Sequence, residues 1–250
     1  MKCFKAIAGL AVVTALRLFV SLPVLADDTP GGKTDIASDA KAPGTQSSKT
    51  FLTYIPPMRG TPGGRIGGGT RGATSEYPDI LALVPDHTGL TIQEQPTLFW
   101  FLSKPVSHPI EFSIIADDAV RPLVETRLKD AGQPGVHCVR LADYGVHLKK
   151  DAGYQWYIAL VTAPNERSKD IIAGGRIERI DPPGDLDSKL GKAGKANAPQ
   201  VYAQNGLWYD SLGAVSDLIA ASPADKTLKS ERISLLRQVG LSEVADYEMK

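Results

Sequence analysis

The chain has 250 residues, of which 42% are hydrophobic and 22% are charged, and its formal net charge is zero. This length supports one hydrophobic core, or one core with a small appendage. Because neither sign of charge dominates, the composition excludes the strongly basic class of nucleic-acid-binding proteins and gives no general attraction to a membrane surface.

Residues 1–26 have the three-part pattern of an export signal peptide. Lys2 and Lys5 form a positive start, residues 6–16 are an apolar stretch, and residues 24–26 form a small-residue exit. The apolar run is too short to span a bilayer, so we expect cleavage rather than a retained anchor. The sequence therefore predicts a periplasmic or secreted protein without a membrane span after cleavage.

Two segments without hydrophobic periodicity follow the signal. Residues 27–50 are small, polar or charged, and they bury too little apolar surface to offset their ordering entropy, so we expect a disordered linker. Residues 51–78 form a Gly/Arg-rich arm, which we expect to be a loop or an extended segment. Residues 67–72 formally match G-x-G-x-x-G, but no strand precedes them and no helix follows, so a nucleotide site is not expected.

Three arginines of this arm, Arg59, Arg65 and Arg71, are spaced by six residues. Guanidinium groups on a glycine-rich backbone can approach a partner closely and bind an anion or a carboxylate. The alternative is that they donate hydrogen bonds to loop carbonyls on the protein's own surface. The sequence leaves both interpretations open.

Residues 79–184 have the pattern of an antiparallel β-sandwich of the immunoglobulin or fibronectin type. Residues 153–162 alternate along a strand, and residues 97–102 form a second apolar run that can lie beside it or across from it. Strands that follow one another at short spacing, with no helical periodicity between them, are typical of a sandwich. Trp and Tyr side chains fill the space between the sheets of such a fold. The predicted strands are residues 80–84, 90–93, 97–102, 110–116, 123–128, 136–141, 155–162 and 171–180.

Residues 185–250 change to a helical period. We predict helices over residues 199–221 and 228–239, each ended by turn-forming residues. Gly206 and Gly240 are 34 residues apart, the period of a tetratricopeptide repeat. There is room for about one and a half such units, fewer than the roughly three that a free-standing array needs. A helical hairpin docked on the sandwich, resembling a partial repeat, is therefore the predicted arrangement.

The connection at residues 166–170 carries mixed charge. Such charge usually solvates a hairpin and protects a sheet edge, but sandwich loops also carry binding sites, so Arg167 and Asp170 are candidate binding residues.

Cys138 lies in a predicted strand and is interpreted as a core residue. The four histidines lack ligand spacing, and we expect no metal and no cofactor.

Three stretches together resemble a cyanobacterial family of exported proteins, the domain of unknown function numbered 928. The resemblance covers residues 54–245 and implies export in a photosynthetic bacterium, without an established activity. The stretches are residues 58–71 (Met-Arg-Gly-Thr-Pro-Gly-Gly-Arg-Ile-Gly-Gly-Gly-Thr-Arg), residues 167–170 (Arg-Ser-Lys-Asp) leading to 175–179, and residues 206–212 (Gly-Leu-Trp-Tyr-Asp-Ser-Leu).

No constellation predicts catalysis, so we expect a non-catalytic exported binding or assembly module with an unidentified protein partner in the envelope and no nucleic-acid partner. One alternative is an enzyme acting on cell-wall or extracellular glycans. That reaction needs two carboxylates about 5–10 Å apart in one cleft, and Glu111, Glu125 and Glu178 are the candidates. The other alternative is a structural spacer. The oligomeric state stays open.

Overall fold

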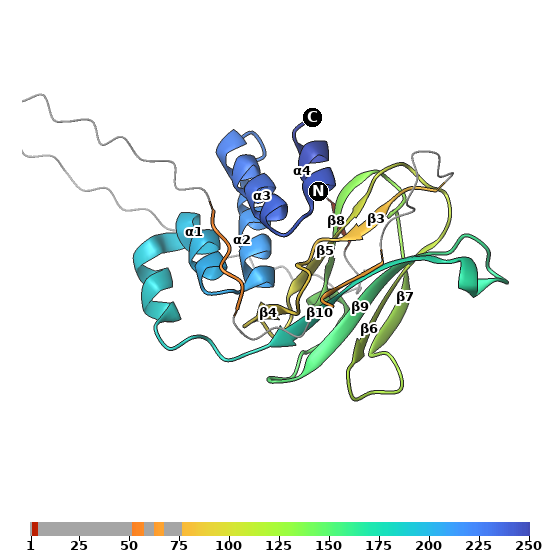
Figure 1. The fold of residues 1–250 in the computed structure, drawn as a ribbon, viewed down its shortest axis with the longest axis horizontal. Coiled ribbons are helices and arrows are strands. Elements are labelled where there is room, and N and C mark those ends of the chain that lie inside the picture. Colours follow the sequence, from red (N-terminus) through yellow and green to blue (C-terminus); the bar gives the residue numbers. More distant parts are fainter. Residues whose placement is uncertain (1, 5–51, 58–62, 68–76) are drawn as a thin grey trace, which may run out of the picture. The chain divides into compact units, whose positions relative to one another are not determined.

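The computed structural model describes residues 2–4, 52–57, 63–67 and 77–250, which belong to one compact unit. Most of the predicted signal peptide, the whole of the predicted linker, and Arg59 and Arg71 lie outside the described residues. The described chain is mainly β, and its helices follow at the C-terminal end (Figure 1).

The strands predicted between residues 80 and 180 are all present, with bounds that differ by at most a few residues. The strands are β1 (Lys2–Phe4), β2 (Arg65–Gly67), β3 (Ile80–Ala82), β4 (Gly89–Thr91), β5 (Thr97–Leu102), β6 (Ile110–Ala116), β7 (Val124–Leu128), β8 (Gly135–Arg140), β9 (Gly153–Leu160) and β10 (Ile171–Arg179).

These strands form two sheets. A four-stranded sheet has the order β1-β8-β5-β3. A six-stranded sheet has the order β2-β10-β9-β6-β7, with β4 added alongside β10. Neighbouring strands are antiparallel except for the parallel pairs β1–β8 and β10–β4. The two strongest sequence signals, β5 and β9, therefore belong to different sheets.

Buried and half-buried side chains alternate along β9, so the six-stranded sheet has a core face and an outer face. Tyr154, Trp156, Ile158 and Leu160 are buried, whereas the intervening side chains are only half-buried. The buried side chains of both sheets join one core, in which Trp100 and Trp156 are among the largest fully buried side chains. The outer face remains available for contacts with other molecules.

Part of the predicted Gly/Arg-rich arm belongs to the core. Leu52 and Tyr54 are buried, and the Tyr54 backbone N–H donates to the side-chain oxygen of Gln238 over 2.8 Å. Strand β2 pairs with β10, so it extends the six-stranded sheet. The described part of the arm is thus held by apolar burial and a strand ladder, whereas the sequence predicted a loop or an extended segment.

Four helices follow the sheets in the described chain: α1 (Leu186–Gln204), α2 (Trp208–Ala221), α3 (Lys226–Gln238) and α4 (Ser242–Glu248). The single helix predicted over residues 199–221 is wrong, because Gly206 adopts φ of 74° between α1 and α2. Helix α1 also begins earlier than predicted and is kinked at Gly194. None of the described helices is long and apolar enough to cross a membrane.

In both helix pairs, α1–α2 and α3–α4, the first helix ends in the same way. Gly206 and Gly240 both have positive φ, 74° and 76°. The following residues, Leu207 and Leu241, each donate a backbone hydrogen bond of 3.0 Å to a carbonyl five residues earlier. This pattern is a Schellman cap, which glycine favours because it lacks a Cβ atom.

Two aromatic residues at the start of α2 attach the helices to the sheets. The indole N–H of Trp208 donates to the carbonyl of Leu83 over 2.9 Å. The Tyr209 hydroxyl accepts from the indole N–H of Trp156 over 2.9 Å and donates to the carbonyl of Arg176 over 3.0 Å. Figure 1 shows α2 next to β4. The three hydrogen bonds reach Leu83 after β3, Trp156 of β9 and Arg176 of β10.

Replacing Tyr209 with Phe should destabilise the fold, because the Trp156 N–H and the Arg176 carbonyl would lose a buried partner. An unsatisfied buried polar group costs about 1–3 kcal/mol, so we expect a loss of about 2–5 kcal/mol in urea unfolding. Tyr157→Phe is the matched control. It removes a hydrogen bond to Gln155 on the half-buried outer face, and it should change stability by less than about 0.5 kcal/mol. Equal losses of unfolding free energy in the two variants would contradict the role of Tyr209 in attaching α2 to the sheets.

Candidate functional site

Of the three predicted arginines of the arm, the structure describes Arg65. Its guanidinium donates to the carbonyl of Val84 over 2.7 Å and to the carbonyl of Val239 over 2.6 Å, and it pairs with Asp86 at 3.4 Å. Burial lowers the pKa of Arg65, and the charge of Asp86 opposes that shift. These contacts match the carbonyl-capping alternative. Anion binding by the arm stays a prediction that concerns Arg59 and Arg71.

Arg167 and Asp170 lie together at a small pocket on the outer face of the six-stranded sheet. We call it the outer-face pocket, and its volume is about 250 Å³. Arg167 belongs to a short 3-10 turn before β10, and Asp170 ends that turn. The pocket is lined by Glu111, Phe112, Ser113, Glu125, Tyr157, Ala159, Arg167, Asp170 and Ile172.

Arg167 links two carboxylates in this pocket. Its Nη2 lies 2.6 Å from Oε2 of Glu111, and its Nε lies 2.9 Å from Oδ2 of Asp170. The hydrogen bond that Arg167 donates to Glu111 is the main cause that raises the pKa of Arg167. The Asp170 side chain is only 3% exposed, and its second oxygen, Oδ1, has no hydrogen-bond partner in the described chain. A buried acceptor without a donor is uncommon and marks a place where a ligand can donate.

Two of the three predicted catalytic carboxylates share this pocket. Glu125 pairs with Ser113 across β6 and β7, and Glu111 pairs with Arg127, so the two glutamates are diagonal neighbours on one face. Glu178 lies on β10 opposite Gly153 and does not line the pocket. With Asp170 included, three carboxylates and one guanidinium line this space, which gives it an excess of negative charge.

A second and larger pocket lies between the helices and the connection from β4 to β5. We call it the Asp210 pocket, and its volume is about 500 Å³. The sequence did not predict it. A sequence signal for it lies in residues 206–212, where the carboxylate of Asp210 directly follows two large aromatic residues, Trp208 and Tyr209. Both aromatic residues are buried in the core. The pocket is lined by Gln93, Gln95, Pro96, Thr97, Lys195, Ala198, Tyr202, Tyr209, Asp210, Gly213, Ala214, Asp217 and Leu218.

The Asp210 carboxyl group is buried and only half satisfied. Its Oδ2 accepts from the backbone N–H of Ile92 over 3.2 Å, and the residue is 5% exposed. Oδ1 is buried and has no hydrogen-bond partner within the part of the chain that the structure describes. Burial raises the pKa of Asp210 to about 7, while hydrogen-bonding groups of Thr91, Ile92 and Gln93 oppose this rise.

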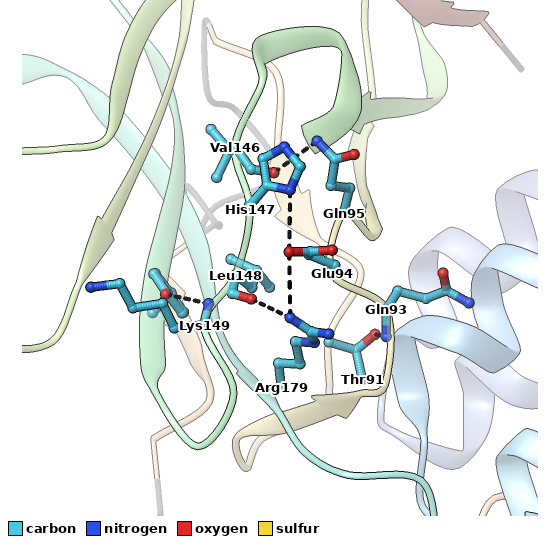
Figure 2. Close-up of polar contacts among 10 residues, drawn as sticks. Thr91, Gln93, Glu94, Gln95, Val146, His147, Leu148, Lys149 and Arg179 are labelled. Carbon is cyan, nitrogen blue, oxygen red and sulfur yellow. Dashed lines mark hydrogen bonds and ion pairs between the residues drawn. The ribbon is translucent and has the colours of Figure 1, made fainter.

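The wall of this pocket formed by residues 91–95 is fixed by polar contacts. Figure 2 shows the Glu94 carboxylate between His147, at 3.3 Å, and Arg179, at 3.8 Å. The Glu94 carbonyl accepts from the N–H of Leu148 over 2.9 Å. The side-chain amide of Gln95 donates to the carbonyl of Val146 over 3.2 Å. The exposed ion pairs add little stability, but together the contacts hold this wall in one conformation.

Metal binding has no support in this part of the chain. Among the described residues, no group of three or more His, Cys, Asp or Glu side chains could hold a metal ion.

The raised pKa of Asp210 predicts a specific pH dependence of stability. The unfolded chain releases this proton near its ordinary pKa of 3.8, whereas the folded chain keeps it up to a pH of about 7. The folded state binds more protons between these values, so the free energy of unfolding falls as pH rises from about 4 to about 7. One pKa unit corresponds to about 1.4 kcal/mol, which sets an upper bound of about 4 kcal/mol.

Asp210→Asn removes this titration, because an amide does not ionise in that range. The difference in unfolding free energy between wild type and variant should therefore fall from about pH 4 to about pH 7, as measured by urea unfolding. The charged or titratable groups around Asp210 are Lys195, Tyr202, Tyr209 and Asp217. Asp217→Asn, at the exposed rim, is the control and should leave the slope unchanged. A pH-independent difference for Asp210→Asn would contradict the burial argument.

Comparisons with known proteins add a family match. The family model described as Domain of Unknown Function (DUF928) matches residues 66–249. Among curated proteins, no sequence matches this chain.

Two solved structures have weak similarity to this chain. The human OSCAR ligand-binding domain has a TM-score of 0.18 and 14% identity, over 41% of this chain and 44% of that one. The chain thus spans less than half of that structure's length. A multi-domain immunophilin from Arabidopsis thaliana has a TM-score of 0.17 and 9% identity, over 70% of this chain and 93% of that one. At TM-scores this low, neither structure supports a fold assignment. The fold is defined by the strand order and register of the chain itself.

Proposed function

The chain belongs to the family Domain of Unknown Function (DUF928), and we propose that it is a non-catalytic binding module that engages a protein partner in the periplasm or cell envelope. The observation that carries this proposal is Oδ1 of Asp170, a buried acceptor without a donor at the edge of a surface pocket.

The size and charge of the outer-face pocket favour a single basic side chain as its occupant. A volume of about 250 Å³ lies below the roughly 300–1,000 Å³ of small-molecule sites. Protein interfaces, in contrast, often insert one anchoring side chain into a pocket of the partner. Three carboxylates facing one guanidinium favour Lys or Arg, whose N–H groups would donate to Asp170 Oδ1.

The surface near the pocket includes exposed apolar side chains. Ile172 lines the pocket and is 42% exposed, and Tyr157 lies half-buried beside it. Apolar groups around a charged anchor point are typical of the central part of a protein interface.

A photo-crosslinking amino acid at position 172 should capture the partner in cells, whereas the same group at the exposed Met249 on the far end of the chain should not. Asp170→Asn should reduce the 172 crosslink by about tenfold or more, since a lost charge-assisted contact is worth at least about 1.4 kcal/mol. Glu166→Gln, in the same turn but outside the pocket, is the matched control. Unchanged crosslinking in Asp170→Asn would refute the assignment of this pocket.

The proposed location depends on export. The positive start, apolar stretch and small-residue exit of residues 1–26 support signal cleavage after Ala26. N-terminal sequencing of the protein purified from its native cells should therefore begin at Asp27. A protein that retains Met1 or Lys2 would contradict export through this signal.

One observation favours glycan hydrolysis as a second candidate function, because Glu111 and Glu125 line the same pocket. Against it, Glu111 already pairs with Arg167. If the chain hydrolyses glycans, the full chain releases reducing ends from cell-wall polysaccharide, and Glu125→Gln abolishes that release while Glu178→Gln does not. No release by the wild type would remove this candidate.

We also propose a finer description of the fold: an immunoglobulin- or fibronectin-like sandwich followed by a helical segment that resembles a partial tetratricopeptide repeat. The matching Schellman caps at Gly206 and Gly240, one repeat length apart, support the resemblance to a repeat. The Trp residues of the shared core support the sandwich assignment.

A further inference from the structure

The Asp210 pocket has no part in the proposed protein contact, yet it has the features of a ligand site. Its walls come from three separate parts of the chain: the connection from β4 to β5, the second half of α1 after the Gly194 kink, and the first three turns of α2. Its volume of about 500 Å³ lies within the range of small-molecule sites.

The base of the pocket presents a fixed and unsatisfied acceptor. Ile92 holds Oδ2 of Asp210 by its backbone N–H, so the carboxyl group cannot turn away without losing that bond. Oδ1 then remains buried, and within the described chain no donor satisfies it. A ligand group that both donates and accepts, such as a hydroxyl, can satisfy this oxygen whether the carboxyl group is protonated, as it is below a pH of about 7, or ionised.

The rim determines what else that ligand must carry. Gln93 and Gln95 bring amide groups, Lys195 brings three N–H donors, and Asp217 brings acceptors. The lining thus offers both donors and acceptors, and the charges of Lys195 and Asp217 offset each other, so the rim does not select a strongly charged ion. Hydroxyl groups fit this lining best, since each one donates and accepts.

Gly213 keeps this space open. It lies inside α2, where glycine destabilises a helix by about 1 kcal/mol relative to alanine. A Cβ atom added at this position would meet nothing within 4 Å, so packing does not require glycine here. The residue lines the pocket, and a larger side chain would extend into it.

We propose that the Asp210 pocket binds a polyhydroxylated small molecule, a small saccharide or related polyol, with a ligand hydroxyl hydrogen-bonded to Oδ1 of Asp210. The other ligand hydroxyls contact the Gln93 and Gln95 amides, Lys195 and Asp217. This site lies apart from the outer-face pocket and does not depend on the protein contact proposed there.

The test is an NMR titration of the full chain with glucose, maltose, sucrose and glycerol. The ligands are used at about 10 mM, where a dissociation constant of about 1 mM gives nearly full occupancy. At least one of the four polyols should shift the Asp210 side-chain carboxyl resonance and the backbone amide resonances of residues 91–95. Gly213→Leu should abolish these shifts by filling the pocket. At pH 8, where the Asp210 carboxyl is ionised and accepts hydrogen bonds, Asp210→Asn should weaken binding about tenfold or more, because a neutral amide replaces a charged acceptor.

The controls separate this site from folding and from the protein contact. Gly213→Ala should raise the melting temperature, which shows that position 213 tolerates a side chain. Asp170→Asn should bind the sugar as wild type does, so failure of one proposal leaves the other standing. The proposal is overturned if none of the four polyols shifts Asp210, or if Gly213→Leu binds as wild type does.

Discussion

The hydrogen bond between the indole of Trp156 and the hydroxyl of Tyr209 joins the two parts of this molecule. Trp156 lies at the centre of the six-stranded sheet, and Tyr209 lies in the first turn of α2. A helix of 14 residues gains most of its stability from packing rather than propensity, so this contact and the neighbouring Trp208 bond determine where α2 lies. Asp210 follows directly, and its burial against residues 91–93 is a consequence of that placement.

The sequence predicted the sheets well because their signal is local. Alternation along β9 and the apolar run of β5 follow directly from the two faces of a strand. The misses have non-local causes. Leu52 and Tyr54 belong to a short apolar run that leads into a Gly- and Pro-rich stretch. Their burial accompanies contacts of this segment with α1 and α3, which lie far along the chain. Helix α4 has only seven residues, too few to show a period.

The candidate sites were predictable to different degrees. Arg167 and Asp170 were identified because the loops of sandwiches often carry binding sites. Their partner Glu111 is more than 50 residues away, and no spacing rule finds it. Asp210 was missed because a carboxylate in a helix normally faces water. Its burial comes from a wall contributed by the segment between β4 and β5. In both pockets, what marks the site is a carboxylate oxygen that the fold leaves without a donor.

The central claim is that the outer-face pocket accepts a basic side chain through Asp170. The most direct measurement follows the side-chain carboxyl ¹³C resonances of the full chain while acetyl-arginine amide is added. The account predicts a saturable shift at Asp170, with little change at exposed carboxylates such as Asp151. Equal, non-saturating shifts at Asp151 and Asp170 would show that arginine meets only the general surface charge, which would contradict the claim.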